Sequence, residues 1–253
     1  SKNESARVWY VLKDRHVRGP FTITIKDSSG KVIRSTPGSS RKGLNSVDLA
    51  MRLPAPLTAS SEVGGAFGSL IGPLLPEGTY TVELNKAGTI ATTTISVITD
   101  TTYGHTASDR EAQQKLVSQL YDLNEELAIT VASLRSGKDE LSRRLLDTTI
   151  TDQAEKTRLK VGYDALDELN KELVNTKVGR VTGEEQLRER LSSLFGEVNR
   201  YLGRPTSSQV SLAATLQQSV NSATQRAQAL LLPFQLESRS SVEERLRKAR
   251  GRK

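Results

Sequence analysis

The spacing of apolar side chains changes near residue 105. In the first part of the chain apolar residues take every second position, as they do from Phe21 to Ile25. Further on they recur every three or four positions, as they do from Leu116 to Leu134. A period of two predicts strands, and a period near 3.6 predicts helices. We therefore expect an α+β chain with two segregated domains, an all-β domain at residues 1–104 and an all-α domain at residues 105–236.

Short alternating runs predict the strands of the first domain. The runs are Val8–Leu12, Phe21–Ile25, Val32–Ile33, Val47–Leu53, Tyr80–Leu84 and Ile90–Ile98. About seven strands in roughly 95 residues are typical of an immunoglobulin-like β-sandwich. Turn and strand-start residues separate them, and the structural positions that we single out are Gly30, Gly43, Asn45, Gly78 and Tyr80.

A long connection rich in Gly and Ser spans residues 57–75. Connections of this length are either functional or mobile. We interpret it as a mobile crossover at the edge of the sandwich, and Gly64, Gly65 and Phe67 are its candidate interaction residues. The Gly64–Gly68 run lacks the Gly-Lys-Ser/Thr of a phosphate-binding loop, so nucleotide binding is not expected.

Local signals divide the second domain into about four helices. Ser108 and Glu111 fit a capping box at the first helix start, and Ser136-Gly137 predicts its end. A second helix then runs to Leu173, with a kink or break at the Thr-rich residues 148–151. A third opens after Gly183.

The fourth helix has the clearest start. Pro205 precedes Thr206-Ser207-Ser208-Gln209, which is a second capping-box pattern. Four helices with short connections should pack as an antiparallel bundle. The apolar seam from Leu116 to Leu134 is then either bundle core or a surface for pairing with a second copy.

Charge is unevenly distributed over the 253 residues. The net charge is +7, and residues 237–253 alone hold 7 basic and 3 acidic side chains. This last stretch has few apolar residues, so we expect a basic tail that is disordered or a frayed helix. It also lacks aromatic side chains for base stacking, so sequence-specific nucleic-acid binding is not expected.

No constellation of catalytic or metal-binding residues emerges. The chain has no cysteine and only two histidines, His16 and His105, neither in a metal-ligand spacing. The acidic pairs Glu125-Glu126 and Glu184-Glu185 fall on faces where we expect solvent. We therefore expect a chain without an active site, a metal or a cofactor, and no apolar run reaches the roughly 20 residues that a transmembrane helix needs.

Three segments appear in an order that resembles a known family. These are Asp27–Arg34, Gly43–Asn45 and Pro76–Leu84, followed by the helices and Gly203–Thr206. They resemble the C-terminal region of bacterial sortilin-like (VPS10-type) BNR/Asp-box proteins, in which an immunoglobulin-like sandwich and a helical segment follow a β-propeller. The resemblance implies an extracytoplasmic location, secreted, periplasmic or at the cell surface. No Asp-box repeat occurs in this sequence, so no propeller activity is carried over.

These patterns predict a non-catalytic structural and protein-interaction module of a larger secreted bacterial protein. Its partner would be another protein or a second copy of the chain. The alternative is an accessory domain of a carbohydrate-active or peptide-binding propeller protein that contacts glycan directly. Trp9 and Phe67 are the aromatic residues that would carry glycan contact.

Overall fold

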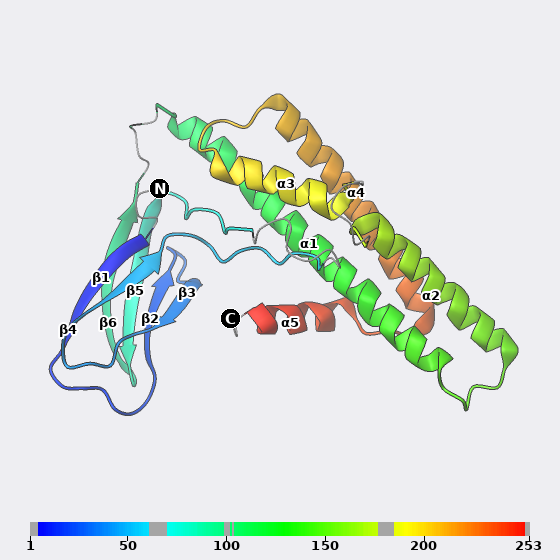
Figure 1. Ribbon diagram of the computed structural model, residues 1–253. Coiled ribbons are helices and arrows are strands. Elements are labelled where there is room, and N and C mark those ends of the chain that lie inside the picture. Colours follow the sequence, from blue (N-terminus) through cyan, green and yellow to red (C-terminus); the bar gives the residue numbers. More distant parts are fainter. Residues whose placement is uncertain (1–4, 61–69, 99–101, 103, 177–184, 251–253) are drawn as a thin grey trace. The chain divides into compact units, whose positions relative to one another are not determined.

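The computed structural model describes residues 5–60, 70–98, 102, 104–176 and 185–250. Strands come first along the chain and helices follow (Figure 1). The chain divides into two compact units. The β unit comprises residues 1–55 and 71–107, and the helical unit comprises residues 56–70 and 108–253. The architecture is thus α+β with strands and helices segregated, as the change of period predicted.

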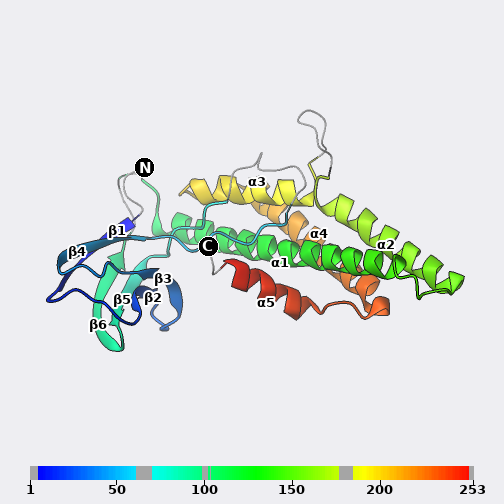
Figure 2. The ribbon, with the colours of Figure 1, turned by 60° about the horizontal axis from the view of Figure 1, so that its bottom comes forward.

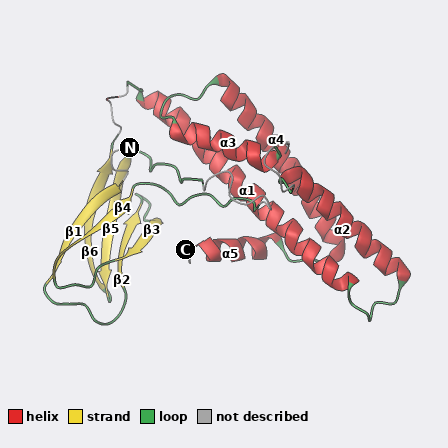
Figure 3. Cartoon of the chain, viewed as in Figure 1, coloured by secondary structure: helices red, strands yellow, loops and turns green. Residues whose placement is uncertain are grey.

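Six strands form two antiparallel sheets in the β unit (Figure 3). The smaller sheet pairs β1 with β4, and the larger has the order β3-β2-β5-β6. The strands are β1 (Ser5–Leu12), β2 (Phe21–Lys26), β3 (Val32–Pro37), β4 (Gly43–Ala50), β5 (Gly78–Lys86) and β6 (Thr89–Val97). Six strands within the described residues are fewer than the roughly seven expected of an immunoglobulin-like sandwich.

Side chains from both sheets share one apolar core. Ile23, Ile25 and Val82 of the larger sheet lie in the same cluster as Leu49 of the smaller sheet. The alternation along β2 and β5 explains this, because every second residue points to the same face of a sheet. The two sheets therefore form two layers around a buried interior.

The turn residues take the conformations that their types allow. Gly30, Gly43 and Gly78 have φ values of +82°, +96° and +150°, which L side chains rarely adopt. Asn45 is buried, and its Nδ2 donates to the carbonyls of Arg41 at 2.8 Å and Gly43 at 2.9 Å. The Tyr80 hydroxyl donates to the Pro76 carbonyl at 2.7 Å. These contacts fix the ends of β3, β4 and β5.

Five α-helices make up most of the helical unit. They are α1 (Ala107–Leu145), α2 (Gln153–Leu173), α3 (Leu187–Arg200), α4 (Ser207–Leu231) and α5 (Arg239–Arg250), with a 3-10 turn, η2 (Leu232–Phe234), after α4. Figure 2 shows α5 beside α1, on the side of α1 away from α3. The main core joins α1 to α2, α3 and α4. It includes Leu120, Leu134, Leu166, Leu191 and Leu216, each at most 1% exposed.

The first helix is longer than the sequence predicted. Gly137 lies inside α1 and not at its end. A Cβ at Gly137 would approach the side chains of Leu231 at 2.6 Å, Leu236 at 3.1 Å and Leu166 at 3.2 Å. The glycine therefore permits close packing of neighbouring segments, and the break falls after Leu145, near the predicted Thr-rich stretch.

The two predicted capping boxes have different outcomes. Thr206 caps α4 as predicted, because its side chain accepts from the Gln209 amide while the Gln209 side chain accepts from the Thr206 amide. Ser108 is not a cap, since α1 already begins at Ala107 and Glu111 follows within the helix. The Ser108 hydroxyl instead accepts from Arg204 at 2.9 Å.

Part of the long connection at residues 57–75 folds with the helices. The sequence had placed this segment in the β domain, as a mobile crossover, so both of these predictions are wrong for it. Ala59 is 4% exposed and belongs to the helical core. Its carbonyl accepts from Arg188 Nε at 2.8 Å, and the neighbouring Ser60 hydroxyl accepts from Arg135 at 2.6 Å. Gly64, Gly65 and Phe67 lie outside the described residues. Residues 56–60 of the predicted sandwich thus belong to the helical unit.

The basic stretch after residue 237 was predicted as a disordered tail or a frayed helix, and the structure excludes the disordered tail for residues 239–250. Residues 239–250 form α5, and Val242 is fully buried. The sequence signal was misleading because arginines, and not apolar residues, supply most of the contacts of this helix.

Candidate functional site

The smaller sheet carries an exposed apolar surface on its outer side. β1 and β4 pair so that Trp9 faces Ser46 and Val11 faces Leu44. Trp9, Val11 and Leu44 are 59%, 69% and 67% exposed. The alternate residues Val8, Tyr10 and Leu12 point to the interior or its margin. We call the outward residues Arg7, Trp9, Val11, Leu44, Ser46 and Asp48 the Trp9 face.

An ion pair closes one end of the Trp9 face. Arg7 donates to both carboxylate oxygens of Asp48, at 2.7 and 3.0 Å, from the directly opposite position on the neighbouring strand. The hydrogen bonds from Arg7 hold the pKa of the Asp48 carboxyl below its ordinary value. The face therefore combines exposed aromatic and aliphatic side chains with a charge pair joined by two hydrogen bonds.

Adjacent exposed apolar groups distinguish this face from scattered surface residues. Val11 and Leu44 are cross-strand neighbours, and Trp9 lies two residues along the same face of β1. Cross-strand neighbours have Cβ atoms about 5 Å apart, so these groups are close enough to form one patch. Contiguous apolar patches rimmed by polar groups mark interaction sites, and Trp is enriched among the residues that dominate binding energy.

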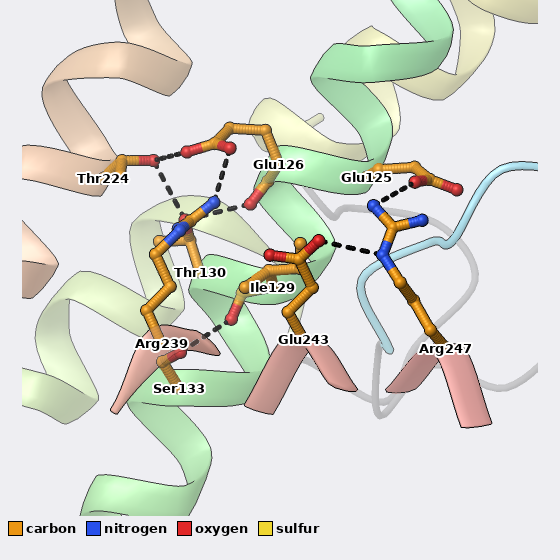
Figure 4. Close-up of polar contacts among 9 residues, drawn as sticks. All are labelled: Glu125, Glu126, Ile129, Thr130, Ser133, Thr224, Arg239, Glu243 and Arg247. Carbon is orange, nitrogen blue, oxygen red and sulfur yellow. Dashed lines mark hydrogen bonds and ion pairs between the residues drawn. The ribbon is translucent and has the colours of Figure 1, made fainter. Parts of the chain in front are cut away.

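A second cluster joins α5 to α1 through acidic and basic side chains (Figure 4). Arg239 of α5 contacts Glu126 at 2.5 Å, and Arg247 contacts Glu125 at 3.3 Å. Arg250 also pairs with Glu125, whose side chain is 10% exposed. This contradicts the expectation that the Glu125-Glu126 pair faces solvent. The sequence could not show the pairing, because more than a hundred residues separate the partners.

Hydroxyl groups complete the cluster around Glu126. The Thr224 hydroxyl donates to Glu126 Oε1 at 3.0 Å, and Arg239 donates to the Thr130 hydroxyl at 3.2 Å. Beside Glu125, burial and the nearby carboxylate raise the pKa of Tyr121. Both carboxylates are thus held by cations and donors from several elements. The arrangement fastens α5 to α1.

The other candidate residues from the sequence remain apart. His16 Nε2 lies 3.1 Å from the Gly19 carbonyl, in the connection before β2. Within the described residues no three His, Asp or Glu side chains form a group that could hold a metal ion. Glu185 is exposed two residues before α3, and Glu184 lies outside the described residues. The structure therefore brings none of the sequence's candidate acids and bases together as a reactive set among the described residues.

The apolar seam of α1 is buried in the helical core. Leu116, Leu120, Leu127 and Leu134 are all buried within the chain's own helical unit. The alternative in which this seam pairs with a second copy is therefore wrong. Elsewhere in this unit, α2 and α4 border an open groove lined by Leu169, Leu230 and an exposed Glu172–Arg226 pair.

Comparisons with protein-family models, with curated proteins and with solved structures gave no match. None of the helices in the described ranges is long and apolar enough to cross a membrane.

Proposed function

We propose that this chain is a non-catalytic protein-interaction module whose partner docks on the Trp9 face. The observation that carries the proposal is the exposure of Trp9, Val11 and Leu44 side by side on one face of a two-stranded sheet. Covering such a patch removes apolar area from water, which is worth about 25 cal/mol per Å². The Arg7–Asp48 pair supplies polar complementarity at its rim.

The setting of the module is a further part of the proposal. We take the β unit as an immunoglobulin-like sandwich and the helices α1 to α4 as an antiparallel four-helix bundle. We also propose that the chain is the end region of a larger extracytoplasmic bacterial protein of the sortilin-like Asp-box type. Support for this setting comes from the turn and strand motifs of the sequence, Asp27–Arg34 and Pro76–Leu84 above all.

Site-specific photo-crosslinking tests the docking proposal. A photoreactive phenylalanine analogue replaces Val11 in the full chain, expressed in its own host. Val161 is a matched control, because it is a valine of similar exposure, 63%, on α2. We expect a discrete adduct from position 11 that excess wild-type chain suppresses and excess Trp9→Ala chain does not. An adduct of equal yield at both positions, or equal suppression by both competitors, would refute the proposal.

Direct glycan contact is the second candidate, and the outward position of Trp9 favours it. Sugar-binding surfaces place an exposed aromatic ring where a pyranose can stack. A glycan array probed with the wild-type chain and with Trp9→Ala separates the two functions. Binding that the substitution abolishes would assign the face to sugar, whereas an array without signal together with a protein adduct assigns it to a protein partner.

A further inference from the structure

The last strand of the larger sheet has an unprotected edge. β6 pairs with β5 on one side and, within the described residues, with no strand on the other. Its sequence from Thr89 to Val97 contains no charged residue, no proline and no glycine. Residues 89–94 are exposed on both faces of the strand. An edge of this kind presents unpaired amide and carbonyl groups to any strand that can align with it.

The other strand edges of the β unit carry protection. β3, the opposite edge of the same sheet, contains Arg34 and Pro37, and its pairing with β2 is irregular at Ile25/Lys26. β1 and β4 carry Arg7 and Asp48. Charges, prolines and bulges are the devices that prevent edge-to-edge association. Their absence from β6 alone singles out this edge.

The core also ends at β6. Thr93 pairs with Val82, which is 2% exposed, yet Thr93 itself is exposed although both residues share one face of the sheet. Ala91 is likewise exposed beside the half-buried Leu84. The smaller sheet therefore leaves this part of β6 uncovered.

We propose that β6 pairs antiparallel with β6 of a second copy, joining two four-stranded sheets into one. Identical antiparallel strands are related by a two-fold axis, so one edge serves both partners. An axis at Thr93 aligns all nine residues: Thr93 faces its own copy, Thr92 faces Thr94, and Ala91 faces Ile95. Threonine pairs and aliphatic pairs stabilise cross-strand contacts, and no like charges meet.

A second copy fits this edge better than an unrelated peptide. Recognition of foreign strands obtains affinity from the backbone and specificity from pockets for alternate side chains. β6 itself consists largely of exposed threonine, isoleucine and alanine side chains from Thr89 to Thr94. β6 of a second copy forms the same backbone hydrogen bonds, and its threonine and aliphatic side chains also lie opposite side chains of the same kind. A single strand edge buries a small area, so the dimer is weak and forms at high concentration.

Sedimentation equilibrium of the full chain over a range of concentrations tests this inference. We expect the average mass to rise from the monomer value of 27.7 kDa toward twice that value. Thr93→Lys and Thr93→Glu each place like charges at the axis and should weaken association by about tenfold. An equimolar mixture of the two variants should restore it, because Lys then faces Glu.

Two controls separate this inference from the proposed function. Thr93→Ser keeps an uncharged strand and should associate as the wild type does. Trp9→Ala leaves β6 unchanged, so it should associate normally while losing any partner of the Trp9 face. Thr93 is exposed, so its charged variants should fold, which thermal unfolding checks. A wild-type chain that stays monomeric throughout, or a mixture no better than either variant alone, would overturn the inference.

Discussion

Glycines in the helical unit have opposite roles at positions that the sequence cannot distinguish. A Cβ at Gly162 of α2 would approach ring carbons of Phe234 at 2.3 and 2.6 Å. A Cβ at Gly196 of α3 would meet nothing within 4 Å. Both lie in helix interiors, where glycine is less favourable than alanine by up to about 1 kcal/mol. Whether the lower helix propensity of glycine is offset depends on the side chains that pack against it, which are present at Gly162 and absent within 4 Å at Gly196.

Paired alanine substitutions measure this difference. Gly162→Ala should lower the free energy of unfolding by about 1–2 kcal/mol, because displacing the Phe234 ring outweighs the gain in helix propensity. Gly196→Ala should raise it by up to about 1 kcal/mol. Urea unfolding followed by circular dichroism checks both. Equal and stabilising effects at the two positions would show that Phe234 does not pack on Gly162.

The lowered pKa values of two carboxyl groups predict how the stability of the helical unit responds to acid. Hydrogen bonds from Arg143 and Arg144 lower the pKa of Glu140 from 4.5 to about 2. Hydrogen bonds from Lys138 and Lys171 lower the pKa of Asp167. A group with a lowered folded-state pKa stabilises the fold above its unfolded pKa, and this contribution is lost as the pH falls through the folded pKa.

We therefore expect the stability of the helical unit to decline as the pH falls from about 4.5 toward 2. Thermal unfolding at a series of pH values measures the decline. Glu140→Gln should flatten part of it, because this variant has no carboxylate to protonate. The Glu140 side chain is substantially exposed, so its share is modest. A slope that is identical in the variant would exclude Glu140 as a contributor.

At the scale of elements, α5 depends on charge more than on apolar burial. Its contacts to α1 are made by Arg239, Arg247 and Arg250 on Glu125 and Glu126, with Val242 as its buried apolar residue. Removing one partner of a partly buried ion pair destabilises the fold, because the other charge is left without compensation. The attachment of this helix should accordingly be easier to break than that of α1 to α4.

Removing one carboxylate tests this attachment. Glu125→Gln should speed amide hydrogen exchange in α5, because Arg247 and Arg250 lose their common partner. Glu172→Gln is the matched control, since Glu172 pairs with Arg226 between α2 and α4, away from α5. Faster exchange in α5 with Glu125→Gln alone is the expected result. Unchanged exchange would mean that Val242 and the Arg239–Glu126 pair suffice to hold the helix without Glu125.

Local patterns predicted the elements whose cause is local. The alternation in β2 and the capping box at Thr206 depend on residues within a few positions, and both were read correctly. Gly137 was misread, because a glycine signals a helix end and a close packing site equally well. The attachment of α5 to α1 was missed, because the acids that its arginines contact lie far away along the chain.

At the scale of the whole molecule, the boundary between β and α sequence does not coincide with the boundary between folded units. Ala59 interrupts the β region in sequence and yet is buried in the helical core. Long-range packing of this kind leaves no periodic signal, so the sequence placed these residues in a crossover. The Trp9 face was missed as a patch for a similar reason, since only the β1–β4 register brings Leu44 beside Val11.

A charge at position 59 tests whether residues 56–60 fold as part of the helical unit. Ala59→Glu should lower the stability of the helical unit by about 2 kcal/mol or more, because it buries a carboxylate. Ala214→Glu, at an exposed position of α4, should have little effect. Hydrogen exchange resolved by peptide shows which unit responds. Destabilisation confined to the strands would contradict the assignment of residues 56–60 to the helices.

The most direct test of the central claim, docking on the Trp9 face, uses the single tryptophan of the chain. Chain labelled with 5-fluorotryptophan gives one ¹⁹F resonance, from position 9, that is recorded in an extract of the cells and growth medium of its source organism. We predict that the signal shifts or broadens, and that excess unlabelled wild-type chain restores it whereas excess Trp9→Ala chain does not. The account would be contradicted if the resonance in the extract were identical to that of the free chain. It would also be contradicted if the wild-type and Trp9→Ala chains restored the free signal equally.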